Sequence, residues 1–211
     1  MNNNNSNNNP KIVGIIHSKH RNAIGLVGIE VNITEKLIYV KLAKQWNRTQ
    51  LNQIPNEIGK LYKKLGWNYT YIDLQTGQHF IQDIQNQRIK VNVITTQKNV
   101  KDTYEIDQAR IMDKIEMVQF MVSLKQNHQV KYISKPNDDM KEMEKQISLF
   151  TEKKTEAGGI DYFAPGNELD SLTKALLIAC FAARKYLGGN NTRNILDMDT
   201  ELVYEENNFR I

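Results

Sequence analysis

Hydrophobic and polar positions along the first quarter of the chain follow the pattern of β-strands. Three segments rich in Ile, Val, Leu and Tyr succeed one another with only short polar connections: Lys11 to Ile16, Ala23 to Val31 and Leu37 to Leu42. A parallel crossover needs about a dozen residues or more, so these connections are too short for one. We therefore expect the three strands to pair mostly antiparallel.

Helices and strands are predicted to alternate over the next part of the chain. Apolar residues at helical spacing predict a helix from Leu51 to Leu65, with Pro55 in its first turn and Gly66 ending it. A strand over Tyr69 to Asp73, a short helix through Ile84 and a strand over Ile89 to Ile94 are expected to follow. This order is a strand, helix, strand unit.

Amphipathic helices are predicted to dominate the second half of the chain. One apolar stripe consists of Ile111, Ile115, Val118 and Val122, and a second of Met140, Met143, Ile147 and Phe150. Between them, Val130 to Ile133 is expected to be a short extended piece. The segment from Thr155 to Asn167 is predicted to be a loop, and Leu169 to Leu187 a strongly apolar helix.

This order of elements indicates the fold class. It favours an α/β protein with a ribonuclease H-like, mixed five-stranded sheet, three strands antiparallel and two parallel, flanked by helices. A chain of 211 residues is long enough for one domain with a sizeable core. We expect residues 1–10 to be a disordered Asn-rich tail, residues 11–188 the domain, and residues 189–211 a polar C-terminal tail.

Composition narrows the classes of function. The formal net charge of +4 is compatible with a polyanionic partner. The single cysteine, Cys180, excludes an internal disulfide framework, and no apolar run has membrane-spanning length, so a cytoplasmic location is expected. The sequence contains neither a Gly-x-x-x-x-Gly-Lys-Ser/Thr loop nor a Gly-x-Gly-x-x-Gly motif, so no site for ATP hydrolysis or dinucleotide binding is visible.

Candidate chemistry lies where strands end. In an α/β sheet, ligands collect at the carboxyl ends of central strands, which draws attention to His17 and Asp73. A turn role would explain Asp73 equally well, and helix capping would explain Asn167, Glu168 and Asp170. Capping does not explain a pairing with Asp73, because two carboxylates from distant segments can together hold Mg²⁺ or Mn²⁺.

Four segments resemble the nuclease domain of viral large terminases: Asp73-Leu74-Gln75-Thr76-Gly77, the long helix containing Met112, the helix near Glu142 to Phe150, and Gly166-Asn167-Glu168-Leu169-Asp170-Ser171-Leu172-Thr173-Lys174-Ala175-Leu176. The resemblance covers the chain from Lys11 to about Leu187. These domains are ribonuclease H-like, metal-dependent endonucleases that cut concatemeric DNA during genome packaging. The resemblance implies an endonuclease of duplex DNA in the host cytoplasm, dependent on Mg²⁺ or Mn²⁺, with a separate packaging ATPase.

The resemblance also implies roles for individual residues. In that family an acid after the fourth strand and an acid opening the last helix bind the catalytic metal, and Asp73 and Asp170 occupy these places. A polar residue three positions before the helix acid often assists, and here it is Asn167. The family's first strand ends in Asp, and the best match in this chain is His17, which supplies no negative charge and cannot bridge two cations.

The substitution at the first strand leaves three possibilities. The chain is a one-metal or Mn²⁺-preferring nuclease that uses His17, a nuclease whose site is completed by another acid such as Glu168 or Glu30, or a pseudonuclease that binds nucleic acid or serves in assembly without cutting. A structure-selective resolvase of the same superfold is a further functional alternative.

Basic residues near the same sheet edge are candidates for gripping phosphates without reading sequence. They are Lys19, Arg21, Lys44, Arg48, Lys98 and Lys101. Because Lys and Arg are spread along the whole chain, an ordinary solvated surface is the alternative explanation.

Overall fold

The computed structural model describes residues 9–18, 23–47, 51–96, 110–132, 136–154, 160–166 and 168–188. The predicted C-terminal tail, and all of the predicted Asn-rich tail except Asn9 and Pro10, lie outside these ranges.

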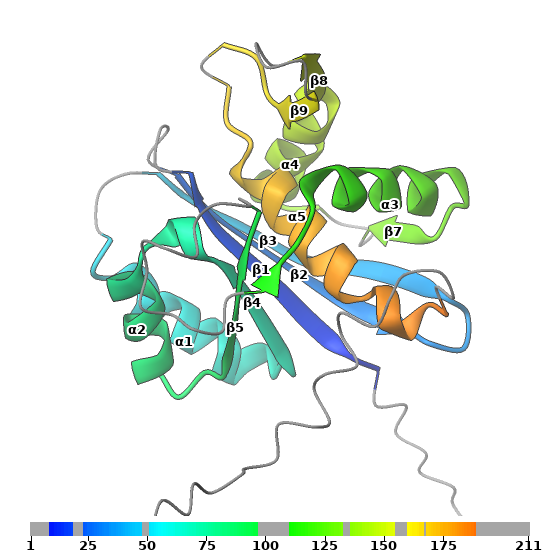
Figure 1. Ribbon diagram of the computed structural model, residues 1–211. Coiled ribbons are helices and arrows are strands. Elements are labelled where there is room, and N and C mark those ends of the chain that lie inside the picture. The colour runs from blue at the N-terminus through cyan, green and yellow to red at the C-terminus, as the bar shows by residue number, and fades with distance from the viewer. Residues whose placement is uncertain are drawn as a thin grey trace, which may run out of the picture.

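A mixed sheet of seven strands, in the order β6-β5-β4-β1-β2-β3-β7, runs through the described part of the chain (Figure 1). Its strands are β1 (Lys11–Ser18), β2 (Ala23–Asn32), β3 (Leu37–Asn47), β4 (Tyr69–Asp73), β5 (Val91–Thr95), β6 (Arg110–Ile111) and β7 (Val130–Tyr132). Strands β1, β2 and β3 pair antiparallel, while β4 pairs parallel with β1, and β5 parallel with β4. The predicted fold class is confirmed, and the short strands β6 and β7 add one parallel pairing at each edge.

Helices cover both faces of the sheet (Figure 1). On one face lie α1 (Ile54–Leu65) and α2 (Gln78–Asn86), and on the other α3 (Lys114–Gln126), α4 (Asp138–Leu149) and α5 (Ser171–Ala182). Two short 3₁₀ helices, η2 (Leu74–Thr76) and η3 (Arg184–Tyr186), follow β4 and α5. As expected, Pro55 lies in the first turn of α1 and Gly66 ends that helix in the left-handed conformation, at φ 58°.

Two glycines let α5 lie directly on the central strands. A Cβ atom on Gly14 of β1 would collide with the backbone of Ala175, and one on Gly25 of β2 would collide with the backbone of Ser171. The first turn of α5 therefore rests on β2 near the carboxyl end of β1, and the helix then crosses β1. This contact fixes the position of Asp170, which directly precedes α5, relative to the sheet.

The apolar stripe predicted for the third helix is wrong. Ile111 belongs to β6, and Met112 precedes the helix, which begins only after Asp113. The Asp113 side chain accepts hydrogen bonds from the backbone amides of the first turn and so sets that start. Val122 is 47% exposed, and the buried residues of α3 are Met117, Met121 and Leu124.

The loop predicted from Thr155 to Asn167 contains a strand. Strand β9 (Ile160–Phe163) pairs antiparallel with β8 (Thr151–Lys154), and Figure 1 shows this hairpin above α4 and the beginning of α5. All four residues of β8 are exposed, so no hydrophobic alternation marks the strand. Among the described residues, none of the helices has the length and apolar character needed to cross a membrane.

Candidate functional site

Asp73 is a fully buried carboxylate at the carboxyl end of β4, 0% exposed. Its Oδ1 accepts a hydrogen bond from the Gln75 amide at 2.8 Å, and its Oδ2 accepts one from Thr96 Oγ1 at 3.5 Å. Burial raises the pKa of Asp73 to about 6, although these hydrogen bonds and the charges of two nearby lysines act in the opposite direction. The bond to Gln75 caps η2, so Asp73 also has the turn role considered above.

Asp170 is a second buried carboxylate, 2% exposed, directly before the first residue of α5. Its Oδ2 forms an ion pair with the ammonium of Lys174, 2.9 Å away. Its Oδ1 is buried and has no hydrogen-bond partner among the described residues. The side chain caps none of the amides of α5, so capping does not account for this acid.

The start of α5 is capped instead from α4. The Leu172 amide donates to Oε1 of Gln146, a residue only 1% exposed, at 2.9 Å. Gln146 Nε2 donates to Gln45 Oε1 at 2.7 Å, and the same oxygen accepts from Ser171 Oγ at 3.0 Å. This network links β3, α4 and α5, and it holds the first turn of α5, and so Asp170, against the sheet. No local pattern in the sequence marks it.

Two lysines lie among the acids of this region. Lys174 pairs with Asp170, and the Lys114 ammonium pairs with Asp161 of β9 at 2.6 Å. Burial would raise the pKa of Asp161, but the hydrogen bond and charge of Lys114 hold it below its usual value, and Lys174 adds to this effect. Because both lysines also lower the pKa of Asp73, the charges of β4, β9, α3 and α5 act on one another. Sequence reasoning missed Lys114, Asp161 and Lys174.

The strand register does not bring His17 to Asp73. In the parallel pairing of β1 with β4, Ile15 lies opposite Ile72, so Ile16 is level with Asp73. Ile16 is 4% exposed and packs on the face covered by α5. The position beside Asp73 therefore carries an apolar side chain.

His17 belongs to the other face of the sheet. Its cross-strand partner on β2 is Ile24, which packs with α1 and α2. Since successive side chains alternate between the two faces, His17 points away from the face that carries Asp73. The resemblance identified where the first strand ends, but it did not show on which face of the sheet the last side chains of that strand lie.

The other acids proposed to complete the site are placed differently. Glu30 lies opposite Lys11 at the amino end of β1, and Asp73 lies at the carboxyl end of the parallel strand β4. Glu30 is therefore at the wrong end of the sheet to complete a site with Asp73, which corrects that expectation. Glu168 is near the start of α5, where it pairs with Lys145 at 3.1 Å. Asn167 lies outside the described residues.

Of the six basic residues predicted to contact nucleic acid, only Lys44 is described. Its ammonium pairs with Asp139 at 3.3 Å and lies 6.0 Å from the centre of the Trp46 ring. Lys19, Arg21, Arg48, Lys98 and Lys101 lie outside the described residues. The strands that precede these undescribed segments, β1, β3 and β5, all end at the edge where β4 ends in Asp73.

Two buried acids are the donors that this edge could offer to a divalent cation. Within the described ranges, no group of three or more His, Cys, Asp and Glu residues is arranged to hold a metal ion. Asp73 and Asp170 offer carboxylate oxygens, the unpartnered Oδ1 of Asp170 among them. Mg²⁺ is commonly held by one or two carboxylates and retains several of its waters, so two acids suffice for one ion. The position level with Asp73 on β1 offers no further carboxylate, because Ile16 occupies it.

Neither a family model nor a curated protein matches the sequence. Solved structures do match the fold. The nuclease domain of the large terminase of Thermus phage P74-26 matches with a TM-score of 0.62 at 15% identity, covering 88% of this chain and 84% of that chain. The large terminase nuclease of thermophilic phage G20c with bound magnesium matches with a TM-score of 0.61 at 16% identity, covering 82% of each chain.

A more distant likeness points to the same fold. The K428A mutant nuclease domain of the large terminase subunit gp2 of bacterial virus Sf6, with manganese, matches with a TM-score of 0.58 at 8% identity. That match covers 81% of this chain and 88% of the other. This chain therefore has the ribonuclease H-like fold of the nuclease domains of phage large terminases.

Proposed function

We propose that this protein is a divalent-metal-dependent DNA endonuclease that holds one cation between Asp73 and Asp170. The observation that carries the proposal is the buried Oδ1 of Asp170, which lacks a hydrogen-bond partner among the described residues. A buried carboxylate oxygen without a partner costs stability unless a ligand satisfies it. The fold shared with terminase nucleases, some of them solved with magnesium or manganese, favours a cation as that ligand.

The proposed chemistry divides between the cation and the chain. A bound Mg²⁺ or Mn²⁺ would supply Lewis-acid activation of water and of the scissile phosphate. Asp73 and Asp170 would hold it through carboxylate oxygens, and Gln75, Thr96 and the cap on α5 fix the positions of these two acids. Because burial raises the pKa of Asp73 to about 6, the share of the ionised acid that can bind a cation grows as the pH rises through that value.

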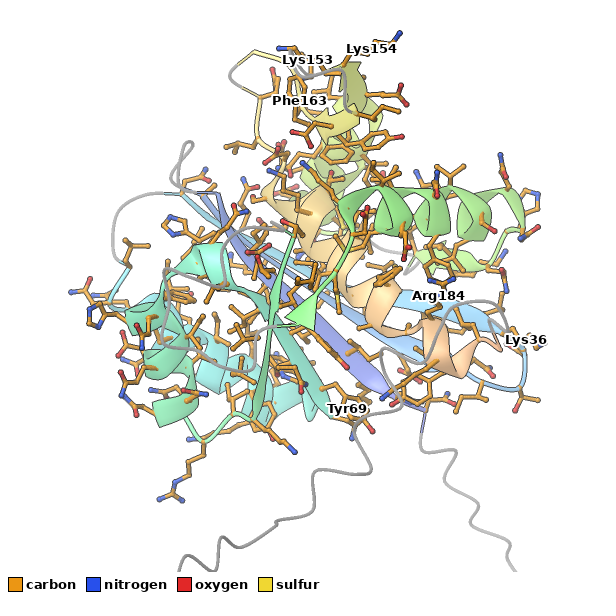
Figure 2. All side chains as sticks on the ribbon, in the orientation of Figure 1. Lys36, Tyr69, Lys153, Lys154, Phe163 and Arg184 are labelled. Carbon is orange, nitrogen blue, oxygen red and sulfur yellow. The ribbon has the colours of Figure 1, made fainter. Side chains whose placement is uncertain are left out.

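The proposed substrate is duplex DNA, held largely without sequence preference. Lys153 and Lys154 stand on the β8–β9 hairpin together with Phe163, at the end of the molecule where α5 begins (Figure 2). The Lys153 ammonium lies 5.3 Å from the centre of the Phe163 ring. Together with the basic residues that the sequence predicts to contact nucleic acid, these side chains would neutralise phosphates. We place such an enzyme beside a separate packaging ATPase in the cytoplasm of an infected host.

A second candidate is a pseudonuclease that binds DNA without cutting it. Ile16 favours this reading, because an apolar side chain stands level with Asp73, where a further metal ligand would be expected. Salt-sensitive DNA binding without cleavage is the behaviour that this candidate predicts.

Cleavage of supercoiled and linear duplex DNA in Mn²⁺, Mg²⁺ or EDTA decides between the two candidates. The nuclease predicts metal-dependent cutting by the wild type that is lost in both Asp73→Asn and Asp170→Asn. Glu30→Gln, at the opposite end of β1, is the matched control and should cut like the wild type. If all four proteins bind DNA and none cuts it, the nuclease is refuted and the pseudonuclease stands.

A further inference from the structure

Lys174 lies one helical turn after Asp170, and its charge acts on more than one acid. Its Nζ is 2.9 Å from Asp170 Oδ2. Its charge also favours the ionised forms of Asp73 and Asp161, which belong to β4 and β9. A single ammonium thus pairs with one buried carboxylate and acts electrostatically on two others.

This ion pair differs from an ordinary pair on a helix surface. Exposed acid–lysine pairs four residues apart contribute only a few tenths of a kcal/mol and are screened by salt. Here the Asp170 side chain is 3% exposed, while the Lys174 side chain is 24% exposed. The acid is buried and its partner reaches solvent, so the lysine is the member of this pair that a ligand from outside can contact.

The charge of the cluster favours one metal ion together with the lysine. Asp73, Asp161 and Asp170, when ionised, outweigh Lys114 and Lys174 by one negative charge. Binding of one divalent cation would change the net charge of these five side chains from one negative to one positive charge. That positive charge matches the single negative charge of a phosphodiester. A second divalent cation would leave an excess that one phosphodiester does not balance, and it would compete with Lys174 for Asp170.

We propose that Lys174 is a catalytic residue whose ammonium binds the scissile phosphate and takes the electrostatic role of a second divalent cation. This inference rests on the nuclease proposed above. In the hydrolysis, a water oxygen forms a bond to phosphorus and one phosphorus–ester oxygen bond breaks. A proton from the water ends on the leaving oxygen, giving an alcohol and a phosphate monoester. Lys174 stays protonated and donates hydrogen bonds to the non-bridging oxygens, where negative charge accumulates.

Two variants separate this role from a merely structural one. Lys174→Met keeps the length of the side chain and removes the charge, whereas Lys174→Arg keeps the charge. Mn²⁺ affinity is measured by calorimetry on the full chain without DNA, and single-turnover cleavage is measured at saturating Mn²⁺. Lys145→Met is the control, because Lys145 pairs with Glu168 on the surface near the same helix start. Unfolding in urea verifies that each variant is folded.

We expect the loss of the Lys174 charge to raise the Mn²⁺ affinity and to lower the rate of cleavage. Lys174→Met should bind Mn²⁺ roughly fivefold tighter or more, because a positive charge beside the site is gone. It should cleave about 100-fold more slowly, the scale for loss of one preorganised donor to transition-state charge. Lys174→Arg should retain much of the rate, and Lys145→Met should match the wild type in both readouts.

The outcomes distinguish this inference from the proposed function. If the wild type cleaves with Mn²⁺ and Lys174→Met cleaves as fast or faster, Lys174 only competes with the metal and the inference is overturned while the nuclease stands. If the wild type neither binds Mn²⁺ nor cleaves, the proposed nuclease is refuted, and this inference falls with it.

Discussion

The burial of Asp73 predicts an inverted pH dependence of stability. Burial raises the pKa of this acid from 3.8 to about 6 in the folded chain. The folded state therefore holds the proton more tightly than the unfolded state, so the free energy of unfolding falls as pH rises between these two values. A shift of about two pKa units corresponds to about 3 kcal/mol, present as destabilisation above pH 7 and nearly absent below about pH 3.

Urea unfolding in EDTA from pH 3 to pH 8 measures this effect when wild type is compared with Asp73→Asn. The asparagine keeps a side-chain oxygen that can accept the hydrogen bond from the Gln75 amide. It carries no charge, so its burial does not incur the cost of removing a charge from water. The stability of the wild type relative to this variant should fall by about 3 kcal/mol across the range. Asp138→Asn is the control, because the Asp138 side chain is fully exposed, and its difference from wild type should stay flat. The reasoning is refuted if the difference in the free energy of unfolding between wild type and Asp73→Asn does not change with pH. It is also refuted if the wild type becomes more stable relative to Asp73→Asn as pH rises.

Three further changes test the placement of α5 and of the hairpin. Gln146→Leu leaves the buried Leu172 amide without its acceptor and should lower the free energy of unfolding by about 2 kcal/mol in urea titrations, whereas the exposed neighbour Glu144→Gln should change it little. Gly25→Ala places a Cβ against the backbone of Ser171 and should lower the free energy of unfolding by about 1–3 kcal/mol in the same assay. Gly28→Ala is the control and should lower it clearly less, because its Cβ meets no atom closer than 3.3 Å. Equal losses in the two variants would contradict the close approach of α5. Lys114→Met removes the 2.6 Å contact to Asp161 and should increase hydrogen exchange in β9 more than in β2, an outcome that uniform exchange would contradict.

The sheet could be predicted from the sequence because its strands carry strong local signals. The apolar runs of β1 and β2, the alternating burial at the start of β3 and the short connections between the three strands leave little choice of pairing. The same signals are absent from β8, whose four residues are all exposed, and from β6, which has only two residues. These strands form because a partner strand is presented to them, and no local pattern reveals the partner.

The acids could be found from the sequence, but their surroundings could not. Asp73 is the last residue of β4 and Asp170 directly precedes α5, and the hydrophobic pattern of the sequence reveals where such strands and helices end or begin. Which face a side chain takes depends on register, and one residue along β1 separates Ile16, on the face of Asp73, from His17, on the opposite face. The pairing of Lys114 with Asp161 joins positions 47 residues apart, and only the folded chain brings them together.

The most direct test of the proposed cation site is an anomalous difference map from crystals of the full chain grown or soaked in Mn²⁺. The account predicts one strong peak per chain, between the carboxylates of Asp73 and Asp170 and within about 2.0–2.4 Å of an oxygen of each. It also predicts that the peak is lost in Asp170→Asn. Two peaks at this edge, or Mn²⁺ bound elsewhere with none between these two acids, would contradict the account.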